Sequence, residues 1–410
     1  MRVQADLLGE IEEVGVELRA ALVPVLQKIA GQRPRPTQLT RALGLDKSLA
    51  SRLVRAANAR TDLDLMHLIP SPAGLRILSD SAGPLLGKPA LSRLNGAVSR
   101  LQRLIDSAPG GRATLDARIS ESSDVARDRR ERIARQSSFK SMSFLIGYYS
   151  DFLSTSLFVV PSANGRAVDG VEINRRIGIR RLRPNTPLPI LSYTPWRDGV
   201  REEEPTRFDS IEGSDETPQP SELLLPKYSG RPLPRFEVVQ DPGRTTVVLP
   251  ADPGAGEIDR LTWAFRLKNG GPIDPGPGLH SLGGYLLHMP CRRLVRDLFI
   301  AEDVYPEAVP RISFVLPDLM AHLRPPHEPG ISRFGDVHIS ASFEELPHSA
   351  RAHSIPGVAD HGEVTREVLE RSGLSGTSLR GWRCEMTYPA PLVQMMLWFW
   401  LPHSASYEKW

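Results

Sequence analysis

The chain has 410 residues, of which 40% are hydrophobic and 24% are charged. This composition excludes disordered, collagen-like and disulfide-dense chains and is typical of a globular protein with two or three domains. The net charge is only +3, but the first 140 residues carry 23 Lys and Arg against 15 Asp and Glu, and the remainder is net acidic. A basic N-terminal part favours a polyanionic partner, although such an excess is also common in ordinary domains.

The two cysteines, Cys291 and Cys384, form no CxxC pair, which argues against a disulfide framework and a zinc ribbon. A reducing cytoplasm is therefore the expected location. Acidic residues interrupt the N-terminus where a secretory signal needs an apolar core. The most apolar stretches, 142–160 and 391–402, are too polar or too short to span a bilayer, so no membrane association is expected.

Helical periodicity dominates the first third of the chain. The longest early segment covers about 5–30, where Pro24 is expected to kink the helix. Further helices are expected at 37–45, 47–59, 71–82, 89–107 and 114–138. We interpret 89–140 as a helical linker or dimerisation stem, with packing onto the first domain as the alternative.

Residues 35–60 have the pattern of a helix-turn-helix, in which two short helices meet at a tight turn. Gly44 permits the turn, Leu45 fills the space between the helices, and Asp46 is placed to cap the second helix. The apolar residues expected to be buried are Leu39, Ala42, Leu43, Leu49, Leu53 and Ala56. The residues on the opposite face, predicted to contact DNA in the major groove, are Lys47, Ser48, Ser51, Arg52 and Arg55.

The segment 39–57 resembles the helix-turn-helix of winged-helix bacterial transcription regulators of the IclR type and, less closely, of the MarR type. The matching residues are Leu39, Gly44, Leu45, Lys47, Ser48, Arg52 and Leu53. The resemblance implies a dimeric repressor or activator that binds a partly palindromic operator. It ends early: where these regulators have a two-stranded wing, this chain offers one strand candidate, 63–69, and then a capped helix.

After residue 150 the hydrophobic pattern alternates with period two, and turn residues separate the segments, which predicts strands. The predicted strands cover 155–160, 171–179, 236–240, 245–249, 261–267, 284–289, 312–316, 336–343, 382–388 and 393–400. The last of these is apolar on both faces and should be central in its sheet. One helix is expected over 363–373, and the polar segment 196–222 is interpreted as an exposed loop or interdomain linker.

Other patterns in the second half indicate chemistry only weakly. Eight histidines lie between 280 and 361, but none is spaced to place two metal ligands on one element, so scattered surface histidines are favoured. Asp360 and His361 lack a nucleophile elbow, and the Gly-rich stretch 271–284 lacks the P-loop pattern. We therefore predict no catalytic residue, no metal site and no cofactor.

Three further alternatives involve arginines and tryptophans. The arginine-rich stretch 171–184 is interpreted as a solvated edge strand rather than a polyanion site. The arginines of 127–135 alternate with acidic residues, which favours ion pairs on an exposed helix over nucleic-acid contact. Trp382, Trp398 and Trp400 are expected in the core, with an apolar ligand pocket as the alternative.

Together these patterns predict an α+β protein with a helix-turn-helix domain at 1–88, winged or not, the stem at 89–140, and a β-rich sandwich- or barrel-like domain at 141–410. The preferred function is a transcription regulator that binds double-stranded DNA as a homodimer and senses a small molecule or protein. Two alternatives stay open: an enzyme with a scattered site in the β-rich domain, and a scaffold whose helix-turn-helix contacts protein. If Lys47, Arg52 and Arg55 are buried or paired with carboxylates, the scaffold is favoured.

Overall fold

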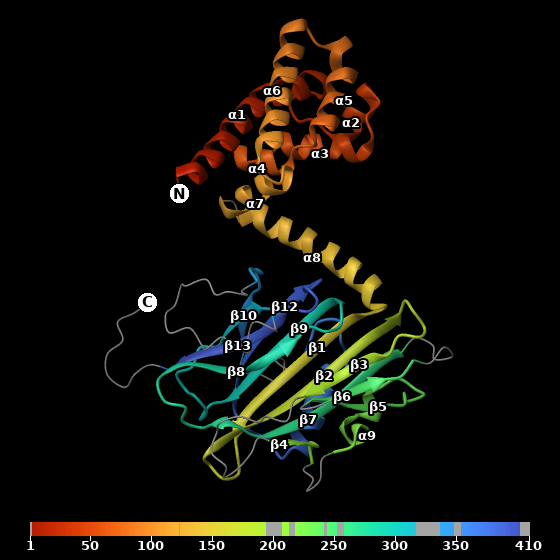
Figure 1. Cartoon of the computed structure of the whole chain (residues 1–410), viewed down its shortest axis with the longest axis vertical. Coiled ribbons are helices and arrows are strands. Elements are labelled where there is room, and N and C mark those ends of the chain that lie inside the picture. Colours follow the sequence, from red (N-terminus) through yellow and green to blue (C-terminus); the bar gives the residue numbers. More distant parts are fainter. Residues whose placement is uncertain are drawn as a thin grey trace. The chain divides into compact units, whose positions relative to one another are not determined.

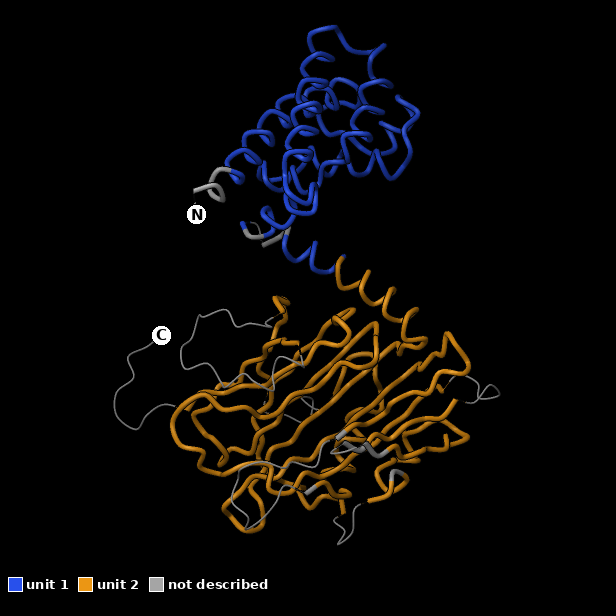
Figure 2. Tube along the Cα trace, viewed as in Figure 1, with its two compact units in different colours: residues 1–133 blue, residues 134–410 orange. Residues whose placement is uncertain are grey.

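The computed structural model describes residues 2–122, 124–193, 207–212, 218–241, 244–251, 258–316, 337–347 and 354–401. The chain divides into two compact units, residues 1–133 and 134–410, coloured separately in Figure 2. The described part contains long helices and extended strands (Figure 1), which confirms the α+β class. None of the described helices combines the length and the apolar composition that crossing a bilayer requires.

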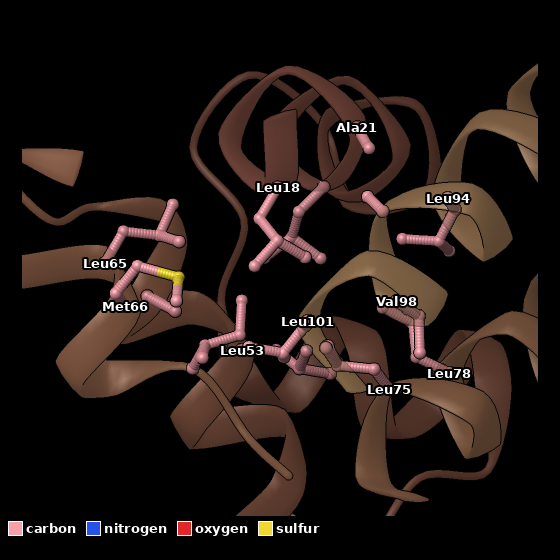
Figure 3. Close-up of a cluster of buried hydrophobic side chains, with 14 of the residues drawn as sticks. Leu18, Ala21, Leu53, Leu65, Met66, Leu75, Leu78, Leu94, Val98 and Leu101 are labelled. Atoms are coloured by element: carbon pink, nitrogen blue, oxygen red, sulfur yellow. The ribbon is translucent and has the colours of Figure 1, made fainter. Parts of the chain in front are cut away.

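The described residues of unit 1 form helices and no strands. These are α1 Arg2–Ala30, α2 Pro36–Leu43, α3 Lys47–Ala57, α4 Asp62–Leu68, α5 Pro72–Ala82, the 3-10 turn η1 Gly83–Leu85, α6 Lys88–Ser107, α7 Arg112–Ser122 and the first part of α8 Asp124–Ile146. One apolar core joins them: Figure 3 shows Leu18 of α1 and Leu53 of α3 near Leu101 of α6. The helices α2, α3 and α6 are amphipathic, and burial of their apolar faces contributes to their stability.

Two sequence expectations on long helices change here. α1 runs continuously through Pro24, and its apolar residues Leu18, Leu22 and Leu26 are buried around that position. α6 belongs to the unit 1 core through Leu94, Val98 and Leu101 (Figure 3), so this part of the expected 89–140 stem packs on the first domain. The boundary between the units falls after residue 133, within α8, and not after residue 88.

The expected strand at 63–69 is wrong, because these residues form α4. The Thr61 hydroxyl accepts the Asp64 N–H at 3.1 Å and caps the helix, and Arg19 forms an ion pair with Asp62. Leu65 and Met66 are buried in the same core as α1. Because α4 and α5 are both helices, the described part of unit 1 has no β wing after α3, which departs from the winged-helix pattern.

The described residues of unit 2 form three open sheets, so the expectation of a barrel is wrong. The strands are β1 Tyr148–Pro161, β2 Ala167–Arg181, β3 Leu188–Tyr193, β4 Arg207–Asp209, β5 Glu237–Asp241, β6 Arg244–Leu249, β7 Ile258–Pro272, β8 Gly278–Leu286, β9 Cys291–Ala301, β10 Arg311–Val315, β11 Phe343–Leu346, β12 Leu379–Thr387 and β13 Gln394–Leu401. The helical segments are α9 Pro220–Leu223, the 3-10 turn η2 Pro226–Tyr228 and α11 His361–Arg371, which confirms the helix expected at 363–373.

The largest sheet, called the main sheet, has the order β11-β12-β9-β1-β2-β7-β4. β1 pairs antiparallel with β2 and parallel with β9. The β13 sheet has the order β10-β13-β8, and the β6 sheet has the order β3-β6-β5 (Figure 1). Leu157 and Leu298 of the main sheet share an apolar cluster with Leu397 of β13. Phe265 of β7 shares another with Ile190 of β3, so both small sheets pack on the main sheet.

The structure confirms one expected strand, corrects another and adds one that the sequence did not suggest. β13 lies in the centre of its sheet and is largely buried, as its two apolar faces predicted. The expected strand at 336–343 is wrong over 337–342, which form no strand; β11 begins at Phe343, and Asp336 lies outside the described residues. β9 was not expected, because the polar residues of CRRLVRDLFIA mask its alternation, yet it is one of the most buried strands.

The expected solvated edge strand at 171–184 is also wrong, because β2 is an inner strand between β1 and β7. Arg175 and Arg176 are completely buried on opposite faces of the main sheet. Arg175 donates to both carboxylate oxygens of Asp360 at 2.9 and 3.0 Å, which explains its burial. Trp382 and Trp398 are buried as expected, and the Trp398 indole donates to Ser313.

Candidate nucleic-acid interface

The turn between α2 and α3 has the geometry that its sequence predicts. Gly44 adopts a φ of 67°, the left-handed conformation that glycine enters without steric cost, and its N–H donates to the Thr40 carbonyl at 2.9 Å. Leu45 is 3% exposed and fills the space behind the turn. The Asp46 carboxylate accepts the backbone N–H groups of Ser48 at 2.7 Å and Leu49 at 3.4 Å. The predicted turn and cap are therefore confirmed.

The buried face of α3 fixes which side chains remain outside. Ala50, Leu53, Val54 and Ala56 are buried, while Leu49 is half-buried. On α2 only Leu39 is buried; Leu43 is half-buried, and the expectation that Ala42 is buried is wrong, since it is exposed. The face opposite Leu53 is thus free to meet a partner.

All five residues predicted to contact DNA lie on α3, and four of them are exposed. The exposed ones are Lys47, Ser48, Arg52 and Arg55, and Ser51 is half-buried. Within the part of the chain that the structure describes, no carboxylate forms an ion pair with Lys47, Arg52 or Arg55. Arg55 donates from Nε to the Ser51 carbonyl at 3.3 Å, which leaves its terminal nitrogens available.

A fourth cation, Arg129 of α8, acts electrostatically on this face. The pKa of Arg129 is lowered by burial and then by the positive charges of Arg55 and Arg52, so these three guanidinium groups repel one another. Its neighbour Arg130 instead forms an ion pair with Asp116 at 2.8 Å. Sequence spacing suggested only exposed ion pairs for this helix, because the effect of Arg52 and Arg55 on Arg129 acts between segments far apart in the chain. The candidate interface therefore comprises the five α3 residues and Arg129.

The cap offers a first test of this arrangement. Replacing Asp46 with Ala is expected to destabilise unit 1 by about 1 kcal/mol, because the first N–H groups of α3 lose their acceptor. Most of the described helical residues lie in unit 1, so circular dichroism at the helix band reports mainly on unit 1 during urea unfolding. Ser71→Ala is the matched control, since Ser71 caps α5 by accepting the Gly74 N–H. Equal stability of Asp46→Ala and the parent chain would contradict the role of the cap.

His67 of α4 provides a second test, through pH. Burial lowers the pKa of His67, and the nearby Arg129 lowers it further, against the opposing effect of Asp116. Both ring nitrogens lack a hydrogen-bond partner among the described residues. A histidine whose pKa is lowered on folding takes up its proton more readily when unfolded, so unit 1 should lose stability as pH falls below about 6.5.

The measurement is urea unfolding of the parent chain and of His67→Gln at pH 7.5 and 5.5, followed by circular dichroism. The parent should lose more stability between the two pH values than the variant does. Arg112 and Arg130 also contribute to the lowered pKa and stay charged throughout this range, so they add no slope of their own. An equal loss in both proteins would exclude His67 as the source.

Within the described ranges, the remaining candidates from the sequence do not gather into a second site. Among the described residues, no group of three His, Cys, Asp or Glu side chains is arranged to hold a metal ion. His280 contacts the Gly276 carbonyl and His288 contacts Arg176, each in a different part of unit 2. His322, His327, His348 and His353 lie outside the described residues. No protein-family model matches this chain, and no curated protein matches it significantly.

Proposed function

We propose that unit 1 binds double-stranded DNA, with α2 and α3 acting as a helix-turn-helix and α3 entering the major groove. The observation that carries the proposal is the exposed, unpaired set Lys47, Arg52 and Arg55 on one face of a helix whose other face is buried. Cations without carboxylate partners are free to replace the counterions of DNA phosphates, which is the main source of affinity in such complexes. The same exposure argues against a scaffold that buries this face.

The roles within the face follow from donor geometry. Arg52 and Arg55 present planar guanidinium groups suited to bidentate contact with guanine O6 and N7. The first half of α3 carries three other donors, Lys47, Ser48 and Ser51. Ammonium and hydroxyl donors suit phosphate oxygens, and such contacts would fix the register of the helix on DNA. Arg129 adds positive charge beside Arg52 and Arg55 and would contact the DNA backbone.

The wider proposal is a cytoplasmic transcription regulator that acts as a homodimer. A dimer would place two copies of α3 on half-sites one helical turn, about 34 Å, apart. Unit 2, in which the main sheet and the two small sheets would form the layers of a sandwich, would supply the sensing function. Its apolar clusters between sheets support that layered arrangement.

Selection from genomic fragments tests this function and identifies the operator in the same experiment. The purified chain is mixed with sheared DNA from its own genome at moderate salt, and the bound fragments are sequenced. We expect enrichment of a few fragments that share a symmetric motif with half-sites about one turn apart. Retention of fragments in proportion to their abundance, or of none, would contradict a sequence-specific regulator. The variant Arg52→Gln, in which a neutral side chain replaces the arginine, should lose the enrichment, because it removes a bidentate base contact.

A further inference from the structure

Three exposed apolar side chains lie together where α8 ends and β1 begins, within unit 2 (Figure 1). Phe144 and Leu145 of α8 are 66% and 62% exposed, and Leu182, which follows β2, is 50% exposed. The Gly147 carbonyl connects the two segments, because it accepts the backbone N–H groups of Leu182 at 2.7 Å and Arg183 at 3.1 Å. We call these three side chains the α8 patch. Grouped apolar side chains rimmed by polar residues are typical of a surface that binds a partner.

The α8 patch is held in place by contacts on its inner side. The Arg183 guanidinium stacks on the Phe144 ring, 5.4 Å from its centroid, and donates to the Leu145 carbonyl at 3.3 Å. One turn earlier on α8, the buried Phe139 packs on the Tyr149 ring with 5.5 Å between centroids. The end of α8 is thus anchored to β1. A surface that is already ordered loses little conformational entropy when a partner binds.

Positive charge surrounds the α8 patch. Lys140 is exposed one helical turn before the aromatic ring and shares its face of the helix. Arg180, two residues before the patch on β2, and the exposed Arg292 share the carboxylate of Asp151 at 3.4 and 3.3 Å. Within the described part of the chain, Lys140 and Arg183 form no ion pair. The patch therefore combines exposed apolar side chains with an excess of cations.

This combination discriminates between the possible partners. A second copy docked through the same patch would bring like charges together, and they would repel one another. Duplex DNA matches the charge, but its phosphates and sugars offer no apolar surface to cover a phenylalanine and two leucines. An anionic bilayer attracts through charge alone, without any fixed geometry. Here the Arg183 and Arg292 guanidinium groups are fixed by aromatic stacking, by a carbonyl and by Asp151, and fixed guanidinium groups suit carboxylates.

A second exposed apolar residue of unit 2 has surroundings of the opposite charge. Val309 is 67% exposed, about as much as the aromatic ring of the patch. The exposed charged residues closest to it in sequence are Glu302, Asp303 and Glu307. The excess of cations is therefore particular to the α8 patch, and Val309 provides a matched control.

From these observations we propose that the α8 patch binds a peptide segment of another protein that carries both carboxylates and large apolar side chains. Phe144, Leu145 and Leu182 pack against the apolar side chains of that segment. Its carboxylates pair with Lys140 and with the guanidinium groups at the rim of the patch. The inference concerns unit 2 alone and does not rest on DNA binding by unit 1.

The test measures binding of the fluorescently labelled full chain to an array of random-sequence peptides of equal length, grouped in sets. The first set combines Asp and Glu with Leu and Phe. The other sets combine Asp and Glu with Ser, Ser with Leu and Phe, or Lys with Leu and Phe. We expect saturable binding to the first set, at least about tenfold tighter than to any other, because only that set offers both carboxylates and apolar side chains.

Three variants assign the binding to the α8 patch. Phe144→Ser should weaken binding to the first set at least about tenfold, since a large aromatic side chain contributes much of the affinity of such a contact. Lys140→Glu should weaken it about fivefold, because an exposed ion pair is replaced by repulsion. Val309→Ser should leave binding unchanged. All three side chains are exposed, so the circular dichroism of each variant should match that of the parent chain.

Several results would overturn the proposal. Equal affinity for the first set and any other would reduce the contact to apolar adhesion or to charge alone. No saturable binding to the first set, or unchanged binding in either Phe144→Ser or Lys140→Glu, would exclude the patch as an acidic-peptide site. Vesicles of phosphatidylserine and phosphatidylcholine form the last arm. Vesicle binding that Phe144→Ser abolishes, without peptide binding, would assign the patch to a membrane surface instead.

Discussion

Replacing Arg52 with Glu is expected to lower the affinity of the chain for its operator by about 100-fold or more. The side chain is exposed on α3 and forms no ion pair within the described residues, so the substitution removes one cation from the interface and adds an anion. The carboxylate would face phosphates or guanine acceptors, both of which repel it. The measurement is equilibrium anisotropy of a labelled operator fragment with the parent and the variant chain.

The control for this prediction is Arg93→Glu. Arg93 is exposed on α6, and the substitution changes the net charge by the same amount. Circular dichroism should be the same for both variants and the parent, because neither side chain is buried. If Arg52→Glu and Arg93→Glu weaken binding equally, the effect comes from overall charge, and α3 is not the recognition helix.

The second large effect is expected in unit 2, at the buried ion pair of Asp297 and Arg383. Arg383 donates from Nε and Nη2 to the two carboxylate oxygens at 2.7 Å each, and Asp297 is 0% exposed. Replacing Asp297 with Ala leaves a largely buried guanidinium without its anion and should cost about 3–5 kcal/mol. Tryptophan fluorescence during urea unfolding measures this, since every tryptophan lies in unit 2.

A double variant separates two contributions to stability: the net stabilisation by the intact ion pair, and the destabilisation that follows when only one partner is removed. Asp297→Ala combined with Arg383→Met should recover much of the lost stability, because an apolar side chain replaces the orphaned charge. Glu212→Ala, which breaks the exposed pair with Arg371, should cost less than about 1 kcal/mol. A double variant less stable than Asp297→Ala alone would contradict this account of the pair.

Local sequence signals predicted the α2–α3 segment well, because its determinants are close together in the chain. The turn depends on the left-handed φ of Gly44 alone. The Asp46 carboxylate accepts backbone N–H groups only two and three residues ahead. The burial of Leu53 follows from helical periodicity. The error at 63–69 has a local cause as well. The spacing of Leu63, Leu65 and Ile69 is compatible with both strand alternation and helical periodicity, and the Thr61 cap favours the helix.

Features that depend on distant partners could not be predicted in this way. Arg175 and Arg176 suggested a solvated strand, yet Arg175 is paired with Asp360, far along the chain, and Arg176 stacks on Trp263. The strand order that places β9 beside β1 is equally non-local. The electrostatic effect of Arg52 and Arg55 on Arg129 arises only when separate segments fold together.

The most direct test of DNA recognition by α3 is equilibrium binding of the full chain to a labelled fragment from beside its own gene, with unrelated DNA as competitor, over a salt series. We expect binding that survives the competitor and weakens linearly with the logarithm of salt concentration. With Lys47→Gln, which removes a phosphate contact, the slope should become shallower by about 1. Absence of binding at low salt, or loss of all binding to the competitor, would contradict the assignment of α3 as a recognition helix.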